Sequence, residues 1–145
     1  LVASSAGIRA VIGYPIHDHA ATVLQRLGGD ASGFAARQLT AKLASSADLV
    51  VTMTKAHRDA VLELAPHKLH KTFTLIETAR LIAECKAKTL KDLSTLRPQL
   101  AAGEVLDIDD PIGHGLEVFS RVGSQIAELL PPVLELCRSS ECPDR

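Results

Sequence analysis

The sequence has few cysteines, no long apolar stretch and no excess of either charge. Its three cysteines, Cys85, Cys137 and Cys142, are too few and too unevenly spaced for a disulfide framework, which favours a reducing compartment. No uninterrupted apolar run approaches the roughly 18 residues that cross a bilayer, and the chain does not open on a charged segment followed by an apolar one. These absences predict a cytoplasmic protein without a membrane partner.

The charged residues exclude a second class of partner. Sixteen basic residues stand against seventeen acidic ones, without a basic block, so nothing in the sequence favours binding to nucleic acid. The 46% hydrophobic and 23% charged residues are typical of a globular protein. A chain of 145 residues suffices for one core, and we expect a single domain over residues 1–138 followed by a polar tail, 139–145. Because the chain opens on Leu1 inside an apolar run, we also expect an N-terminally incomplete domain.

Apolar runs rich in β-branched residues predict three strands. The strongest spans residues 48–53, Asp-Leu-Val-Val-Thr-Met, and has the continuous apolar character of a parallel strand covered on both faces. Residues 1–5 and 72–76 are shorter candidates. Helical patterns separate these runs, so the sequence predicts an α/β fold with a parallel sheet flanked by helices in three layers.

Spacing of apolar residues and stop signals predict the helices. Residues 17–27 form one, ended by Gly28-Gly29, and a short one follows Thr40, which we expect to be its N-cap. Residues 56–64, ended by Pro66, and 77–85 form two more, and helical structure over 90–100 is interrupted near Pro98. The last helix begins near Leu116, and we expect Pro131-Pro132 to break or kink it.

Asp110-Pro111 is the candidate for chemistry, within the run Leu106-Asp-Ile-Asp-Asp-Pro-Ile-Gly113. Such a run is good turn chemistry, and an aspartate in it is commonly a turn or N-cap residue. Pro111 also has a fixed φ, which can hold the preceding carboxyl in a defined extended geometry. The histidines, including His57, are scattered and expected to be exposed, and His17 and His19 are expected to point to different sides of a helix. We expect no metal and no cofactor.

Four ordered stretches resemble the low-molecular-weight protein tyrosine phosphatase family. They are Ser4-Ser5-Ala6-Gly7, Ala36-Arg37-Gln38-Leu39, residues 47–53 followed by His57, and Asp110-Pro111. Together they extend the resemblance over about residues 2–136. Each stretch alone is a weak signal, whereas the ordered set is fairly specific.

The resemblance implies a four-stranded parallel sheet and hydrolysis of phosphotyrosine through a phosphocysteine intermediate. In the family a Cys-x5-Arg loop, which follows the first strand, holds the phosphate with backbone N–H groups and a bidentate arginine, and the same positive field lowers the pKa of the thiol. An aspartic acid of the Asp-Pro loop protonates the leaving phenolate. By this resemblance Asp110 is the general acid.

The sequence contains no Cys-x5-Arg. Cys85 is followed by Lys91 where an arginine is wanted, and a lysine is a point charge that cannot replace the guanidinium fork. The resemblance therefore implies the family fold without its first, central strand, and a chain that is inactive as given. Two alternatives stay open: a non-catalytic phosphatase-like interaction module and, ranked last because only Cys85 lies in mid-chain, the arsenate-reductase branch of the same fold.

Two further departures bear on the substrate. The family commonly has histidine at the position of Phe34 and aromatic residues at Ile112 and in the loop 8–12, so recognition of phosphotyrosine is not assured. The expected partner is a phosphorylated protein or a small phosphomonoester. Self-association through the unpaired sheet is a further expectation.

Overall fold

The computed structural model describes residues 1–100 and 106–140 of the chain. The elements and their bounds are α1 (Asp18–Arg26), α2 (Ala41–Ser46), β1 (Val50–Thr52), α3 (Lys55–Leu64), the 3-10 helix η1 (Pro66–Lys71), β2 (Thr72–Thr74), α4 (Leu75–Ala83), α5 (Leu90–Leu96), the 3-10 helix η2 (Arg97–Gln99) and α6 (Leu116–Ser140).

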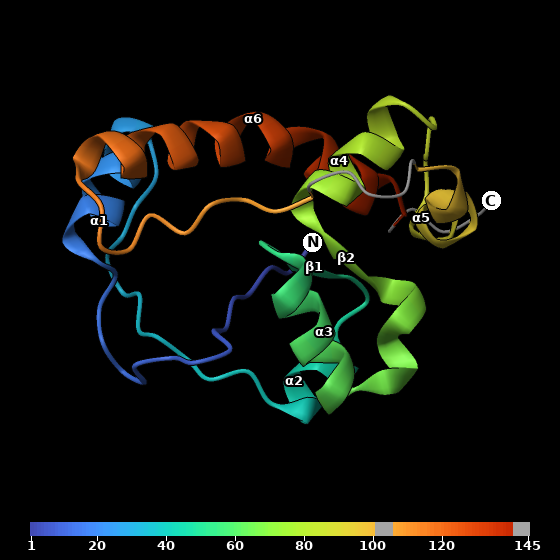
Figure 1. Ribbon diagram of the computed structural model, residues 1–145, viewed down its shortest axis with the longest axis horizontal. Coiled ribbons are helices and arrows are strands. Elements are labelled where there is room, and N and C mark those ends of the chain that lie inside the picture. The colour runs from blue at the N-terminus through green and yellow to red at the C-terminus, as the bar shows by residue number, and fades with distance from the viewer. Residues whose placement is uncertain (101–105, 141–145) are drawn as a thin grey trace.

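Strands β1 and β2 form a parallel pair with Val50 opposite Thr72 and Val51 opposite Phe73. Successive side chains of a strand point to opposite faces. Val50 packs against apolar residues of α2 and α3, whereas Val51 packs against those of α4 and α6. Figure 1 shows the same layers, with α4 and α6 on one side of the strands and α2 and α3 on the other. The predicted α/β class, a parallel sheet flanked by helices, is confirmed.

The strand expected over residues 1–5 is wrong. These residues have no regular structure, and the neighbouring Gly7 forms only an isolated parallel bridge with Gln38. Val2 is 96% exposed. An apolar run forms a strand only where a second backbone supplies its hydrogen bonds, and within residues 1–100 and 106–140 none is paired with this one.

Helix α4 begins two residues earlier than predicted, because Thr74 caps it. The Thr74 Oγ1 accepts a hydrogen bond from the Glu77 N–H at 3.1 Å, and the Glu77 Oε1 accepts one from the Thr74 N–H at 3.3 Å. This reciprocal capping box satisfies two of the donors that a helix start leaves free. The third strand therefore ends at Thr74 rather than at Ile76.

Arg97 links η2 to β2. Its guanidinium lies over the Phe73 ring, 3.8 Å from the ring centroid, and donates to the carbonyl oxygen of Thr72. Its Nε lies 3.4 Å from an oxygen of the buried Glu77 carboxylate. Burial lowers the pKa of the Arg97 guanidinium, an effect that the Glu77 charge opposes. An arginine nevertheless stays charged at neutral pH, so this contact is an ion pair.

The expected break at Pro131-Pro132 is also wrong, since α6 runs through both prolines. Both prolines are exposed, while Val133 and Leu136, which follow them, are buried. A proline lacks an N–H group and its ring crowds the preceding turn, and a helix tolerates both best on its solvent side. Packing of the residues beyond the prolines thus holds the last turns on the core.

Helix α6 extends into the first residues of the expected polar tail. Ser139 and Ser140 belong to the last turn of α6, where the Ser140 Oγ accepts a hydrogen bond from the Leu90 N–H at 3.3 Å. The rest of the expected tail, residues 141–145, lies outside the described residues.

Candidate active site

The segment that carries Asp110 is anchored at the carboxyl end of β1. Ile108 is buried, and its N–H donates to the Met53 carbonyl oxygen at 2.9 Å, directly after the strand. The Asp107 Oδ1 accepts a hydrogen bond from the Lys55 N–H at 2.7 Å, at the start of α3. Carboxyl ends of parallel strands are where open α/β sheets bind ligands. The loop therefore presents its acidic residues at the edge where chemistry is expected.

Asp110 is exposed and is held by a local turn. Its Oδ1 accepts a hydrogen bond from the Ile112 N–H at 3.0 Å, and Gly113 completes the turn at φ +86°. Asp109, its neighbour, instead pairs with Arg121 of α6 at 3.4 Å. The second oxygen of Asp110 has no hydrogen-bond partner among residues 1–100 and 106–140. One carboxyl oxygen is thus free to meet a ligand.

Asp110 and Pro111 are among the residues that line a cleft of about 510 Å³ between α1 and α6. His57, in the first turn of α3, lines the same cleft and is half-buried, so the expectation that it is exposed is wrong. The walls are mostly apolar: Ala20, Val23, Leu24 and Leu27 from α1 and its end, Met53 and Ile108 beside β1, and Phe119, Val122, Ile126, Ala127 and Leu130 from α6. The cleft is lined mostly by apolar side chains and by a few polar ones.

His17 and His19 do not diverge as expected. His17 is the N-cap of α1 and lies outside the helix, with its Nδ1 accepting from the His19 N–H at 3.1 Å. Its ring stacks on the buried Phe119 ring at 4.7 Å between centroids, and the His19 ring meets the edge of the same phenylalanine at 5.3 Å. Sequence spacing could not reveal this cluster, because it depends on a contact between α1 and α6.

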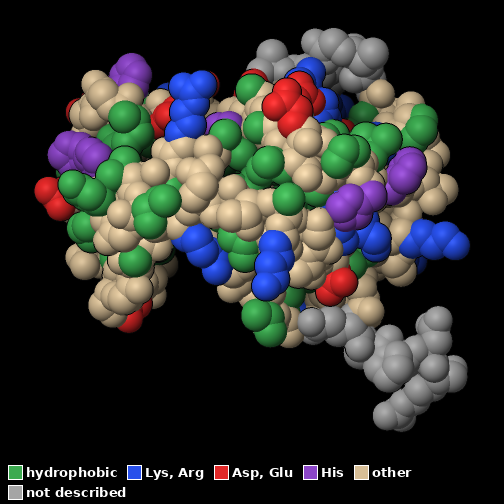
Figure 2. Space-filling view, turned by 90° about the horizontal axis from the view of Figure 1, so that it is seen from below, with side chains coloured by type: hydrophobic (Ala, Val, Ile, Leu, Met, Phe, Trp, Pro, Cys, Tyr) green, Lys and Arg blue, Asp and Glu red, His purple; other side chains and the backbone are tan. Residues whose placement is uncertain are grey.

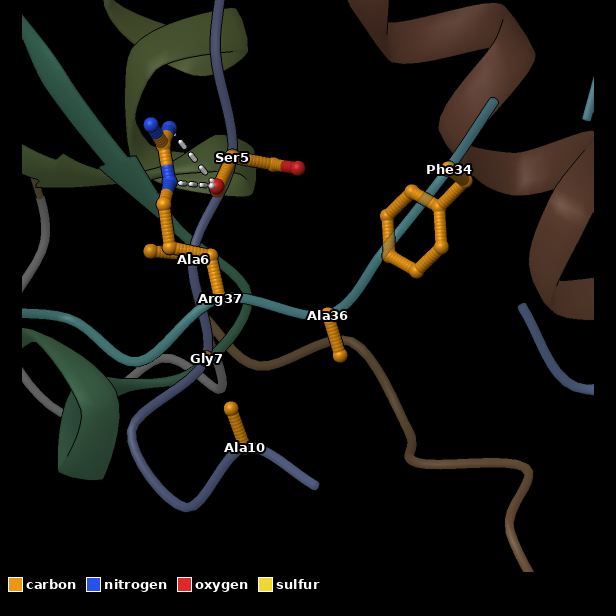
Figure 3. Close-up of a pocket in the computed structure, with 7 residues that line it drawn as sticks. All are labelled: Ser5, Ala6, Gly7, Ala10, Phe34, Ala36 and Arg37. Atoms are coloured by element: carbon orange, nitrogen blue, oxygen red, sulfur yellow. Dashed lines mark hydrogen bonds between the residues drawn. The ribbon is translucent and has the colours of Figure 1, made fainter. Parts of the chain in front are cut away.

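The first two stretches of the family resemblance fold against each other. The Gly7 N–H donates to the Arg37 carbonyl oxygen at 2.8 Å, and the Leu39 N–H donates to the Gly7 carbonyl oxygen at 2.9 Å. The Arg37 guanidinium donates from Nε and Nη2 to the Ser5 carbonyl oxygen, at 3.2 and 3.0 Å (Figure 3). Two segments about thirty residues apart thus form one loop platform.

A second hollow, of about 300 Å³, opens on this platform. Its lining residues are Ser5, Ala6, Gly7, Ala10, Phe34, Ala36 and Arg37. Figure 3 shows the Phe34 ring on the other side of Ala36 from the Arg37 guanidinium. Gln38 joins the two segments of the platform, since its Nε2 donates to the Ile8 carbonyl oxygen at 2.6 Å and its Oε1 accepts from the Ala10 N–H at 2.9 Å.

Neither described cysteine lies in a position to act as a nucleophile beside Asp110. Cys85 is half-buried at the end of α4 and packs against the cluster around Phe73. Cys137 is half-buried on α6 and packs against the cluster around Val133. Neither thiol lines the cleft or the smaller hollow. The described part of the chain thus offers a carboxyl for proton transfer and no thiol next to it.

Comparison with known proteins places the chain among phosphatases. Residues 1–88 match the family model described as low molecular weight phosphotyrosine protein phosphatase. This match includes the Ser4–Gly7 and Ala36–Leu39 stretches and β1, and it ends before Asp110.

Two curated relatives carry different substrate names. The probable low molecular weight protein-tyrosine-phosphatase EpsP of Ralstonia nicotianae is 40% identical over 73 residues, which are 50% of each chain. The protein-arginine-phosphatase of Geobacillus stearothermophilus is 27% identical over 137 residues, 94% of this chain and 77% of that one. The chain spans about half the length of the first of these relatives.

A solved structure extends the likeness beyond the part that the family model covers. The low molecular weight protein tyrosine phosphatase from T. tengcongensis superimposes with a TM-score of 0.69 at 26% identity, over 91% of this chain and 75% of the other. The fold, the two paired motifs and the family match agree. The chain belongs to the low molecular weight phosphotyrosine protein phosphatase family.

Proposed function

We propose that this domain contributes the general acid, Asp110, to hydrolysis of a phosphomonoester. The observation that carries the proposal is the position of Asp110. It is exposed in the lining of a cleft beside the carboxyl end of β1, with one carboxyl oxygen free, and its loop is fixed by the buried Ile108. A general acid must combine such access with a fixed position.

The reaction follows from what the family resemblance implies. A cysteine thiolate attacks phosphorus, the bond to the ester oxygen breaks, and the protonated Asp110 gives its proton to that oxygen as it leaves. The Asp110 carboxylate then takes a proton from water, which attacks the phosphocysteine and releases inorganic phosphate and the thiolate. The 145 residues contain no Cys-x5-Arg, so we propose that the nucleophile belongs to a segment outside this sequence and that the chain alone is inactive.

The test is a fusion of this chain to a family segment that carries Cys-x5-Arg. We expect the fusion to hydrolyse aryl phosphates and the chain alone to show no turnover. Asp110→Asn in the fusion should lower kcat by roughly 10² to 10⁴ for an ester with a poor leaving group, and by less for an activated one, because a low-pKa phenol needs little protonation.

Asp109→Asn is the matched control. Asp109 is the exposed neighbour whose carboxylate pairs with Arg121, so its loss should change the rate little. Equal losses from both substitutions, or an Asp110 effect independent of leaving-group pKa, would show that Asp110 is only a turn residue. Turnover by the unfused chain that Cys85→Ser abolishes would contradict the proposed origin of the nucleophile.

We propose a phosphorylated protein or a small phosphomonoester in the cytoplasm as the substrate. One of the two relatives is named a tyrosine phosphatase and the other an arginine phosphatase. In this chain the residue after Asp110-Pro111 is Ile112, which is 61% exposed and aliphatic. An aliphatic side chain offers a phenyl ring no stacking partner. Comparing kcat/KM of the fusion for phosphotyrosine and for alkyl phosphates measures how far Ile112 relaxes the preference for aromatic over alkyl esters.

A non-catalytic interaction module is the second candidate. The lack of Cys-x5-Arg in the sequence and the open apolar cleft favour it. A fusion that folds, contains the cysteine and arginine and yet does not turn over aryl phosphate would decide for this candidate.

A further inference from the structure

The segment that leads to Asp110 alternates between buried and exposed residues. Leu106 and Ile108 are buried. Asp107 and Asp109, which follow them in turn, are exposed. Figure 1 shows this segment running from the strands to the start of α6. The apolar side chains therefore hold the segment on the core, and the acidic side chains are left to make polar contacts.

Asp107 is bonded to the first turn of α3. Its Oδ1 accepts the Lys55 N–H at 2.7 Å, whereas the N-cap of this helix, Thr54, accepts the His57 N–H at 3.1 Å. The two side chains thus satisfy two of the donors that the start of a helix leaves free. The helix dipole favours a carboxylate at this place, and a hydrogen bond to a charged acceptor is stronger than one to a neutral acceptor.

The other polar side-chain contacts of the loop restrain it less. The Asp110 Oδ1 accepts the Ile112 N–H, which belongs to the loop itself. Asp109 pairs with Arg121 of α6, but both side chains are more than half exposed, and such ion pairs contribute little. Among residues 1–100 and 106–140, the bond of Asp107 is therefore the firmest side-chain link between this loop and a neighbouring helix.

The helix turn that Asp107 caps belongs to the candidate site. His57 lies in that turn and lines the same cleft as Asp110, whereas Asp107 does not line it. One carboxylate thus joins the loop of the general acid to a second element of the cleft. A misplacement of about 1 Å in a reacting group can lower a rate by about 10². The bond of Asp107 therefore bears on proton transfer from a distance.

We propose that Asp107 is a positioning residue, which holds the loop of Asp110 on the start of α3 so that the acid meets the leaving oxygen in one orientation. The inference rests on the proposed function, because the position serves the proton transfer from Asp110. Asp107 exchanges no proton and acts only through the Lys55 N–H. Without this bond the loop samples more orientations, so kcat falls while binding of the substrate is kept.

A proline at position 55 removes the donor and leaves Asp107 in place. Proline is well tolerated at the first residue of a helix, and Thr54, with φ −134° and ψ 162°, has the extended backbone that suits a residue before proline. Lys55→Ala is the matched control, because it loses the same side chain and keeps the N–H. Asp107→Ala removes the acceptor instead, and Asp107→Asn keeps an oxygen that can accept.

NMR order parameters of the backbone amides in the unfused chain measure the position without any catalysis. We expect the amides of residues 109–112 to fall from the rigid range, about 0.85, to below about 0.6 in Lys55→Pro and in Asp107→Ala. They should stay near 0.85 in Lys55→Ala and Asp107→Asn, and the amides of α5 should not change in any variant. Loop amides that stay rigid in Lys55→Pro and Asp107→Ala would overturn the proposal.

The fusion to a Cys-x5-Arg segment tests the catalytic consequence. We expect Asp107→Ala to lower kcat about tenfold to 100-fold for an ester with a poor leaving group, and KM to stay within about twofold. The loss should shrink for an activated ester, as that of Asp110→Asn does. In the Asp110→Asn background, Asp107→Ala should cause no further loss, because no acid is left to position.

Asp92→Ala is the control for a carboxylate at another helix start. The Asp92 Oδ2 accepts the Lys88 and Thr89 N–H groups at the beginning of α5, and Asp92 lines neither hollow of the described chain. Its loss should leave kcat unchanged for both esters. A fall in kcat equal to that of Asp107→Ala would show that any weakened helix start has this effect, which would overturn the positioning role.

The outcomes separate the position from the reaction. Equal losses from Asp107→Ala with and without the Asp110 carboxyl would overturn the proposal even in an active fusion, because they would show a general loss of structure. Equal losses from Lys55→Pro and Lys55→Ala would also overturn it, since the N–H would not be the group that matters. A fusion without turnover removes the proposed function, while the loop amides of the unfused chain still decide whether Asp107 holds the loop.

Discussion

Two threonines that cap helices in the same way differ in burial, and this should separate their contributions to stability. Thr74 is fully buried, and its Oγ1 accepts the Glu77 N–H at 3.1 Å. Thr89 is exposed, and its Oγ1 accepts the Asp92 N–H, also at 3.1 Å. Removing either hydroxyl leaves one N–H without its partner, but water can replace only the exposed one.

We therefore expect Thr74→Ala to lower the free energy of unfolding by about 2 to 3 kcal/mol and Thr89→Ala by about 0.5 to 1 kcal/mol. Urea unfolding followed by circular dichroism measures both. Thr74→Ser keeps the hydroxyl and is expected to recover most of the loss. Equal effects of the two alanine substitutions would contradict the burial of the first cap.

Single residues show where sequence reasoning succeeds and where it stops. Thr40 is confirmed as the N-cap of α2, since its Oγ1 accepts the Leu43 N–H at 3.2 Å and an N-cap depends only on nearby residues. Lys86 has a left-handed φ of 62°. Lysine rarely adopts this conformation, so the sequence could not predict it. The stacking of His17 on Phe119 could not be predicted from the sequence either, because the two residues are about one hundred positions apart.

At the scale of elements, α6 packs tightly against α1 at Gly123. A Cβ added there would lie 2.4 Å from Cγ1 of Val23 on α1. Alanine gains about 1 kcal/mol of helix propensity over glycine, but overpacking costs about 1 to 3 kcal/mol. We expect Gly123→Ala to lower the melting temperature, although the same change raises helicity in an isolated peptide.

Ser124→Ala is the control at an exposed position on the same helix, and it should be neutral or slightly stabilising. Val23→Ala in the Gly123→Ala background removes the clashing methyl groups. The double variant should then lose less stability than the two single losses added together. A higher melting temperature for Gly123→Ala alone would show that the two helices are farther apart.

Strong local patterns predicted elements better than weak ones did. The run 48–53 and the stripe before Pro66 correspond to β1 and α3, because each is long and ends on a clear signal. The strand over residues 1–5 failed, since a strand is completed by a partner that may lie anywhere in the chain. The prolines of α6 failed as stop signals because buried residues beyond them outweigh two lost hydrogen bonds.

For the whole molecule, the open cleft between α1 and α6 implies modest stability, because its apolar walls are left partly uncovered within the described chain. We expect the chain to unfold with a free energy near the lower end of the usual range, about 5 kcal/mol. Urea unfolding followed by circular dichroism measures this free energy. A value near the upper end, about 15 kcal/mol, would show that the open cleft costs little.

The arrangement of the elements in the whole molecule was the part that the sequence predicted least. Asp110 could be singled out from its neighbours, but its place beside His57 at a cleft depends on how α1, α3 and α6 meet. The even charge balance was visible, and on the face shown in Figure 2 basic, acidic and histidine side chains are interspersed. Composition thus describes a surface on average, whereas a cleft depends on contacts between distant segments.

The pairing of α1 with α6 also sets an order of events during synthesis. α1 ends at Arg26 and α6 begins at Leu116, so the ribosome makes 89 residues between them. At roughly 5 to 20 residues per second that interval lasts about 4 to 18 seconds. Throughout it, the apolar stripe of α1 lacks the helix that will cover it. The nascent chain therefore exposes the apolar face of an amphipathic helix to chaperones and to neighbouring polysomes until α6 is translated.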